Sequence, residues 1–339
     1  MMTLGTFQRY AITGLLLLVW LVLIPVSPGA GGPGAVTLKV AFTPLSSWGP
    51  LFIADSEGFF GREGIKVEWV TFAGAADTVA VLVQGSLDVA AGAASAGFFN
   101  AAAHGERVRI VADKGHAEPG FREIALVVRR GLKGGVAPTL ADLKGRKVAV
   151  NTIGSVVHYL LAQSLARVGM GLKDVEIVRM PFPSMVAALQ QGGIDGAVLA
   201  EPFVTQAVEM GAGTVLLAAG DVIPDEPIAF IFYGPNLLAR APDLGRRFMV
   251  AYLRGTRQYA QGPTERNIRI IANYTKIEID VLRKAGWFPI SADGRVNINR
   301  IRRFQDWLYD QELVGVRLPV ASVVDLSFAQ YANQLLQGR

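Results

Sequence analysis

The pattern of apolar and polar positions along the chain contains one stretch twice. Residues 78–92 read TVAVLVQGSLDVAAG, and residues 185–199 read MVAALQQGGIDGAVL. Each copy predicts a helix that ends at a Gln-Gly break, then an Asp, then a short apolar strand. Glycine supplies the left-handed residue that ends a helix, and a small apolar run is typical of a buried parallel strand. Asp88 and Asp195 occupy the same place in the repeat, which indicates a shared structural role in capping the turn.

The similarity extends upstream with a shift of a single position. Residues 40–43 match residues 148–151, and residues 54–68 match residues 162–176. Two copies of a β-α-β-α-β unit therefore account for residues 36–220. The repeat predicts an α/β protein with two doubly wound lobes.

Two apolar, β-branched segments are predicted to cross between the lobes. Residues 123–129 read EIALVVR, and residues 227–233 read PIAFIFY. Lobe 1 is then predicted to comprise residues 36–122 and 227–339, and lobe 2 residues 123–226. Two crossings form a hinge rather than a single rigid core. The helical remainder, from Pro242 to the C-terminus, is predicted to be a buttress of lobe 1 without chemistry of its own.

Residues 1–35 are predicted to be a signal peptide and linker. They hold one charge, Arg9, an apolar run over residues 11–24, and a stretch rich in Pro, Gly and Ala. This order is typical of secretion, whereas a transmembrane helix needs about 20 apolar residues. We expect a periplasmic or extracellular protein, with an uncleaved membrane anchor as the alternative.

Composition narrows the classes of function. The chain has no cysteine, which excludes disulfides, Cys-zinc sites and thiol catalysis. The net charge is +5, and the basic residues are scattered apart from Arg300, Arg302 and Arg303, which we interpret as a solvated helix face. No nucleic-acid partner is indicated.

The repeat also predicts where a ligand binds. Ligands of doubly wound sheets lie beyond the carboxyl ends of the strands. Loop 43–48 is expected to face 151–155, and loop 73–77 to face 181–184, with helix N-termini that favour an anion. Ser46 or Ser47 is predicted to cap the first helix, with Pro50 in its first turn. A cleft lined by paired loops is typical of a binding protein, and no catalytic or metal constellation is found.

These segments resemble a known family. The opening helix SSWGPLFIADSEGFF, the motif QGSLDVA, the stretch LKGRKVAV and the motif IDGAVLAEPF are similar to the periplasmic substrate-binding proteins of ABC importers, in the branch for nitrate, sulfonate, taurine and thiamine-pyrimidine precursors. The resemblance implies a type II periplasmic-binding-protein-like fold, a monomer that closes on a small molecule, and a membrane permease as partner. No cofactor is implied.

The candidate ligand-binding residues follow from the loops and the resemblance. They are Ser46, Ser47, Trp48, Gly74, Ala75, Ser95, Thr152, Gly154, Ser155, His158, Phe182, Ser184 and Glu201. Each also has a structural interpretation: Trp48 as core, His158 as a satisfied buried residue and Glu201 as part of a salt bridge at the hinge. Lys114 and His116, near the first crossing, are secondary candidates.

The class of ligand remains open between two possibilities. An anion such as nitrate or a sulfonate suits the helix N-termini, but a carboxylate at Glu201 would repel it unless offset. The aromatic residues favour a small organic ligand, such as an aromatic acid or a pyrimidine-like ring. Two alternative functions are a ligand sensor for a membrane receptor and a pyrimidine-synthase-like enzyme. The resemblance implies a cysteine-rich motif for that enzyme, which this chain lacks.

Overall fold

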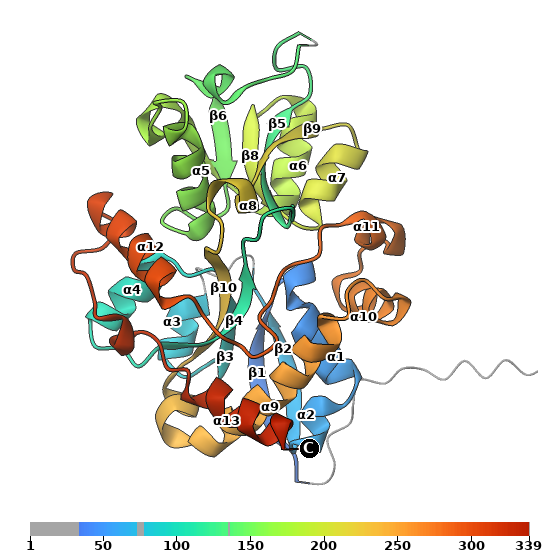
Figure 1. Cartoon of the computed structure of the whole chain (residues 1–339), viewed down its shortest axis with the longest axis vertical. Coiled ribbons are helices and arrows are strands. Elements are labelled where there is room, and N and C mark those ends of the chain that lie inside the picture. The colour runs from blue at the N-terminus through green and yellow to red at the C-terminus, as the bar shows by residue number, and fades with distance from the viewer. Residues whose placement is uncertain (1–33, 73–77, 135, 339) are drawn as a thin grey trace, which may run out of the picture.

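The computed structural model describes residues 34–72, 78–134 and 136–338. Its strands form two five-stranded sheets, one in each half of the molecule (Figure 1). The first sheet has the order β2-β1-β3-β10-β4, and the second has the order β7-β6-β8-β5-β9. The strands are β1 (Val36–Phe42), β2 (Ile65–Thr71), β3 (Val89–Gly92), β4 (Arg109–His116), β5 (Ile124–Arg129), β6 (Lys147–Val150), β7 (Glu176–Arg179), β8 (Gly196–Ala200), β9 (Gly213–Ala218) and β10 (Pro227–Tyr233).

The two sheets share one topology. In each, the strand at the second position, β1 or β6, pairs in parallel with the strands on either side of it. The fourth position is taken by an antiparallel strand. That antiparallel strand is β10 in the first sheet and β5 in the second. Both strands are predominantly buried because helices cover the sheets on both faces. The α/β class and the two-lobed architecture predicted from the repeat are confirmed.

The helices alternate with the strands in each lobe and then form a C-terminal group (Figure 1). They are α1 (Gly49–Ser56), α2 (Phe59–Arg62), α3 (Thr78–Val83), α4 (Ala96–Ala103), α5 (Val156–Ala166), α6 (Phe182–Gln191), α7 (Phe203–Glu209), α8 (Ala219–Val222), α9 (Pro242–Tyr259), α10 (Glu265–Thr275), α11 (Ile279–Lys284), α12 (Ile298–Asp310) and α13 (Ser327–Gln337).

The repeated turn has the same structure in both lobes. Gly85 and Gly192 have φ angles of 75°, the left-handed region that glycine adopts without strain. Asp88 then accepts a hydrogen bond from the backbone N–H of Lys39 at 2.8 Å, and Asp195 accepts the equivalent bond from Lys147 at 3.2 Å. The carboxylate of Asp88 thus ties its turn to β1, and the carboxylate of Asp195 ties its turn to β6. The predicted structural role of the two aspartates is confirmed.

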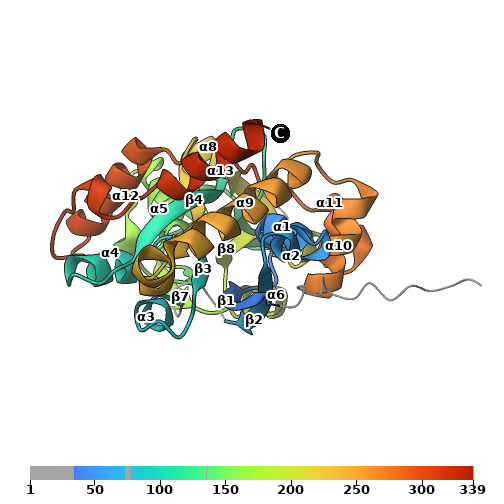
Figure 2. The same cartoon turned by 90° about the horizontal axis from the view of Figure 1, so that it is seen from below.

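The C-terminal helices pack mainly on lobe 1. Helix α9 crosses α1 so closely that a Cβ atom on Gly255 would lie 2.2 Å from the carbonyl oxygen of Pro50. Figure 2 shows α13 beside α9, with α10 and α11 at one end of the molecule and α12 at the other. Helices α11 and α12 depart from this arrangement, because α11 also contacts α7 and α12 contacts α5, both in lobe 2.

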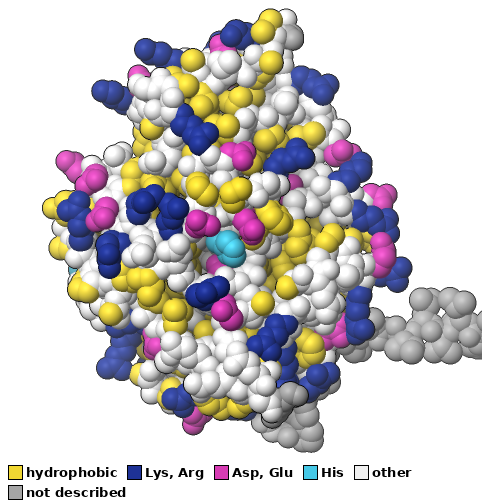
Figure 3. Space-filling view, in the orientation of Figure 1, with side chains coloured by type: hydrophobic (Ala, Val, Ile, Leu, Met, Phe, Trp, Pro, Cys, Tyr) yellow, Lys and Arg dark blue, Asp and Glu magenta, His cyan; other side chains and the backbone are white. Residues whose placement is uncertain are grey.

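The predicted signal peptide lies outside the described residues, apart from its last positions. Among the helices that the structure describes, none combines the length and the apolar character needed to span a bilayer. On the face shown in Figure 3, basic and acidic side chains are interspersed among apolar ones.

Candidate functional site

A small cavity lies between the two sheets, where the lobes meet. Its volume is about 50 Å³, and its walls come from both lobes, from both crossing segments and from the C-terminal region. It is lined by Thr43, Leu45, Ser47, Trp48, Gly92, Ala93, Ile124, Asn151, Val157, Phe182, Ala200, Ile228, Ala229 and Phe288. None of these described lining residues carries a charge, so the cavity wall is apolar with a few hydroxyl and amide groups.

Part of the lobe 1 wall is a 3-10 turn over residues 46–48, of which Ser47 and Trp48 line the cavity. Trp48 is 2% exposed and donates from Nε1 to the carbonyl oxygen of Ala41 at 3.2 Å, which fixes its ring. The prediction that Ser46 or Ser47 caps helix α1 is wrong, because neither side chain caps it. Ser46 Oγ instead donates to the carbonyl oxygen of Glu201 in lobe 2, at 3.2 Å.

Lys114 lies directly behind that wall. It falls in a β-bulge of β4, where Gly115 pairs with Ala229 and Asp113 with Phe230, so that Lys114 is the extra residue. Its ammonium group lies 2.9 Å from Ser47 Oγ and 3.2 Å from the centre of the Trp48 ring. Burial lowers the pKa of Lys114 well below its usual value, although the negative charge of Asp113 opposes this shift.

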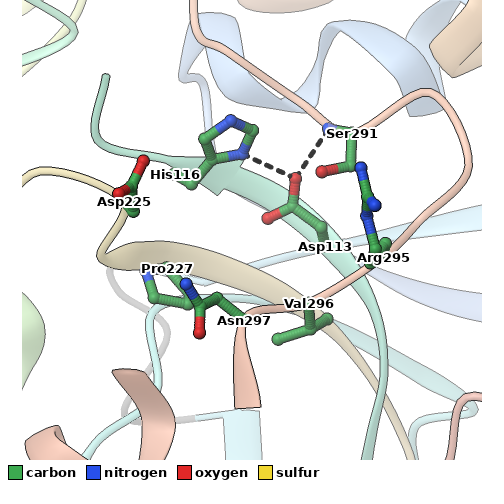
Figure 4. Close-up of a pocket in the computed structure, with 8 residues that line it drawn as sticks. All are labelled: Asp113, His116, Asp225, Pro227, Ser291, Arg295, Val296 and Asn297. Carbon is green, nitrogen blue, oxygen red and sulfur yellow. Dashed lines mark hydrogen bonds and ion pairs between the residues drawn. The ribbon is translucent and has the colours of Figure 1, made fainter. Parts of the chain in front are cut away.

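Asp113 lines a second cavity, together with His116 and Ser291 (Figure 4). Its Oδ2 atom accepts from His116 Nδ1 at 3.1 Å and from the backbone N–H of Ser291 at 2.7 Å. Burial lowers the pKa of His116, but the Asp113 carboxylate outweighs this effect and raises it. This second cavity has a volume of about 340 Å³. Asp113 therefore fastens the end of β4 to the C-terminal loop.

The predicted lobe 2 loop 152–155 is closed on itself, and none of its residues lines the cavity. Gly154 has a φ of 70°, and its backbone N–H donates to His158 Nδ1 at 3.1 Å. Ser155 Oγ donates to the carbonyl oxygen of Thr152 at 2.8 Å. Burial lowers the pKa of His158 to about 4, and its ring packs edge-on against Trp307 of α12. His158 is thus a neutral residue that shapes the loop, and it does not line the cavity.

Two further predicted residues join the lobes beside the cavity. Ser95 and Ser155 form an antiparallel β-bridge between lobe 1 and lobe 2. Next to it, the backbone N–H of Ala96 donates to the carbonyl oxygen of Gly154 at 2.8 Å. These contacts join a loop of lobe 1 directly to a loop of lobe 2, so the two lobes touch each other in this structure.

The remaining predicted residues lie in different environments. Phe182 lines the cavity and stacks on Phe203 at 6.0 Å. Ser184, in the first turn of α6, is exposed and is not among the lining residues. Gly74 and Ala75 lie outside the described residues.

Glu201 is buried at the hinge, away from the lining of the cavity. Its carboxylate accepts from the backbone N–H of Gly286 at 2.9 Å and from both the N–H and the hydroxyl of Thr205. Burial raises its pKa, and these hydrogen bonds oppose the shift. These partners are neutral, so Glu201 is held at the hinge by hydrogen bonds and not by the salt bridge that was the predicted alternative. One of these bonds joins it to the C-terminal segment.

Two other glutamates are buried at the crossings. Glu123 precedes β5, and Glu226 precedes β10. Both oxygens of Glu123 and Oε2 of Glu226 are buried without a hydrogen-bond partner among the described residues. Burial raises the pKa of each carboxyl to about 8, so both are largely protonated at neutral pH.

Three cavity features were missed or underrated in the sequence. Lys114 is only a secondary candidate near the first crossing in the sequence, whereas the structure places it within β4, which extends to His116. Asn151 belongs to the predicted ligand-facing loop 151–155, but it is not among the candidate ligand-binding residues. The C-terminal region was expected to hold no chemistry, yet Phe288 lines the cavity and Gly286 holds Glu201. A lysine within the apolar pattern of RIVADKGH was the signal available for the first of these.

The arrangement defines a class of protein: two doubly wound lobes, joined by two crossing segments, with a cavity between them, form a two-lobed binding-protein fold of type II. The described residues hold no group of three or more His, Asp or Glu side chains that could share a metal ion. The chain belongs to the NMT1-like family, whose model matches residues 31–275.

Known proteins agree with this class. The taurine-binding periplasmic protein of Escherichia coli (strain K12) is 33% identical over 175 residues, which are 50% of each chain. The nitrate-binding protein NrtA of Synechocystis PCC 6803 superposes with a TM-score of 0.74 at 18% identity, over 91% of this chain and 90% of the other. The alkanesulfonate-binding protein SsuA of Xanthomonas axonopodis pv. citri has a TM-score of 0.66 at 20% identity, over 87% and 99%.

The fold is also shared with an enzyme. The desulfurization enzyme DSZB has a TM-score of 0.62 at 16% identity, over 89% of this chain and 99% of that one. Likeness at this level of identity establishes the fold and not the activity.

Proposed function

We propose that the protein is the extracytoplasmic solute-binding component of an ABC importer, which closes two lobes on a small molecule. The observation that carries this proposal is the cavity between the lobes, whose lining includes residues of both lobes and of both crossing segments. A ligand held there contacts each part that must move when the lobes open or close. Binding and lobe closure are thereby coupled.

The proposed lobes are residues 36–122 with 227–339, and residues 123–226. Ligand first contacts the lobe 1 wall at Ser47 and Trp48, and lobe 2 then closes with Phe182 over it. Closure is completed by the β-bridge between Ser95 and Ser155 and by the bond from Ser46 to lobe 2. Thr152 and Gly154 shape the closing loop, while Gly74 and Ala75 remain predicted contacts.

We assign His158 and Glu201 to positioning roles, because His158 Nδ1 and the Glu201 carboxylate are engaged with the protein and neither residue lines the cavity. Ser184 is assigned to the exposed rim of lobe 2. The ligand is a small organic or anionic molecule, such as a sulfonate, nitrate, an aromatic acid or a pyrimidine-like compound.

The proposed partner is an ABC permease, and the proposed location is the periplasm, as printed in the name of the taurine-binding relative. We propose a monomeric binding protein without enzymatic activity. The chain's lack of cysteine excludes thiol catalysis within this fold. A sensor for a membrane receptor would use the same cleft, and a failure to support uptake in cells that carry the permease would favour it.

The test is a thermal-shift panel on purified, ligand-stripped protein with nitrate, alkyl and aryl sulfonates, aromatic carboxylates and pyrimidines. At a hundredfold its Kd a ligand stabilises by about 2.7 kcal/mol, which raises Tm by roughly 5 °C. The rise should be lost in Ser47→Ala and kept in Ser86→Ala, which alters an exposed turn serine. A panel that leaves Tm unchanged would contradict the proposed ligands.

A further inference from the structure

Lys114 is a buried ammonium group placed directly behind the lobe 1 wall of the cleft. Its side chain is 0% exposed, and it contacts two lining residues, Ser47 and Trp48. Asp113, its neighbour in the chain, turns its carboxylate to other partners (Figure 4). Lys114 therefore has no ion-pair partner among the described residues. Burial without an ion-pair partner makes the charged form of this lysine costly, so a negative group brought beside it would stabilise that form.

The contact with Lys114 decides which way Ser47 faces. A charged ammonium group donates hydrogen bonds and cannot accept them, so Ser47 Oγ is the acceptor in the 2.9 Å contact. The hydroxyl hydrogen of Ser47 then has no acceptor among the described residues. It is available as a donor to a group in the cavity that Ser47 lines.

The opposite wall carries the complementary group. Asn151 lines the cavity from lobe 2, and its Oδ1 atom is buried without a hydrogen-bond partner among the described residues. A buried amide oxygen without a partner costs stability, and a donor on a ligand would satisfy it. One wall of the cavity thus offers a donor backed by a cation, and the other offers an acceptor.

We propose that the cleft selects a small acid that also carries a hydrogen-bond donor, with the acid group at Ser47 backed by Lys114 and the donor group at Asn151. This inference rests on the proposed binding function and narrows its ligand class. Lys114 acts through Ser47 and through its charge, so it is a specificity-determining residue behind the wall. Because the described lining residues are uncharged, Lys114 supplies the positive charge next to the cavity.

The assignment predicts a coupling between ligand and proton. Burial holds the pKa of Lys114 well below normal in the free protein. An anion placed beside it stabilises the charged form and raises that pKa again, so anion binding takes up protons where the free amine is partly neutral. A neutral ligand has no such effect.

The experiment is isothermal titration calorimetry with matched probes. Propane-1-sulfonate is compared with its neutral sulfonamide, and 2-hydroxyethanesulfonate with ethanesulfonate; 4-hydroxybenzoate and benzoate form a carboxylate pair. Each titration is run in two buffers of different ionisation heat to count protons. We expect each hydroxylated acid to bind more tightly than its plain counterpart and propane-1-sulfonate to bind more tightly than its sulfonamide, with proton uptake for the acids and none for the sulfonamide.

Two variants separate the two ends of the site. Lys114→Met should weaken acid binding roughly 10- to 100-fold, because charge-assisted hydrogen bonds are the strong ones, and should abolish proton uptake. It should also raise Tm, since an unpaired buried cation is removed, whereas a merely structural lysine would lower it. Asn151→Ala should remove the preference for hydroxylated over plain acids. The matched control is Lys173→Met, an exposed lysine of lobe 2.

The outcomes distinguish this inference from the proposed function. Wild-type protein that binds the sulfonamide as tightly as the sulfonate keeps the binding function and overturns the role of Lys114. The same holds if Lys114→Met binds acids unchanged, or if Ser47→Ala loses no affinity for them. Protein that binds none of the probes, nor any solute of the wider panel, overturns both.

Discussion

The loop that follows β1 in lobe 1 and the loop that follows β6 in lobe 2 occupy equivalent places in the fold, yet they differ in chemistry. In lobe 1, residues 46–48 present a serine and a tryptophan that rest on the ammonium group of Lys114. In lobe 2, residues 152–155 turn their polar groups inward onto each other and onto His158. The two lobes thus share a fold, but only the lobe 1 loop contacts a lysine, Lys114, among the interactions of the described residues. In the proposed mode of binding, lobe 1 therefore holds the acid group of the ligand, and lobe 2 covers the ligand and accepts its donor at Asn151.

The largest expected difference between the walls concerns their aromatic residues. Trp48→Ala should lower the free energy of unfolding by about 3–5 kcal/mol, because the ring is fully packed in the core of lobe 1. Phe182→Ala should cost less, since its ring is packed mainly by Phe203 at the edge of lobe 2. Urea unfolding followed by circular dichroism measures both.

Trp48→Phe is the matched control, because it keeps an aromatic ring over Lys114 and removes the indole N–H. We expect an intermediate loss, from the hydrogen bond to Ala41 and the smaller ring. If Phe182→Ala were as damaging as Trp48→Ala, lobe 1 would not be the more rigid wall, and the assignment of recognition to it would lose its support.

The origin of this asymmetry sets the limit of what the sequence could predict. The repeat at a nearly constant offset predicted two lobes, the glycine turns and the paired aspartates, because these depend on local pattern. The position of Lys114 depends on a bulge in β4, which the pattern of apolar residues does not show. The roles of Phe288 and Gly286 depend on a C-terminal loop that returns to the hinge, a long-range contact with no local signature.

The crossings offer a second comparison, between Glu123 before the lobe 2 strand and Glu226 before the lobe 1 strand. Each carboxyl has a pKa of about 8 when folded and an ordinary value of 4.5. The folded state therefore binds more protons between these values, so stability falls as pH rises from about 4.5 to about 8. The loss is about 1.4 kcal/mol for each unit of pKa difference that is realised.

Glu123→Gln and Glu226→Gln remove one carboxyl each and should flatten this part of the profile of Tm against pH. We expect effects of similar size, because burial raises the pKa of both carboxyls to about 8. The neighbouring charges differ: Glu118 and Glu201 also raise the pKa of Glu123, whereas Arg300 and Arg303 oppose the shift at Glu226. His116 lowers the pKa of Glu123 and must remain intact in both variants. A wild-type Tm that stays constant between pH 5 and 8 would contradict this prediction. It would show that water reaches both carboxyls and keeps their pKa near the ordinary value.

The smallest expected effect concerns the covering loop itself. Gly154 has a φ of 70°, and a Cβ atom there would lie 2.9 Å from the Cβ of Ala96 in lobe 1. Gly154→Ala should cost about 1–2 kcal/mol for the left-handed backbone and should also hold the lobes apart. Gly169→Ala is the matched control, since Gly169 has the same φ and open space at that position.

Both variants therefore carry the same backbone strain, and only Gly154→Ala obstructs closure. If lobe 2 acts as a cover, Gly154→Ala should bind ligand more weakly and remain more extended in small-angle scattering with ligand present, while Gly169→Ala should behave as wild type in both measurements. Equal affinities in the two variants would mean that lobe 1 holds the ligand without closure. The recognition assigned to Lys114 and Ser47 would then suffice, because their contacts lie entirely within lobe 1.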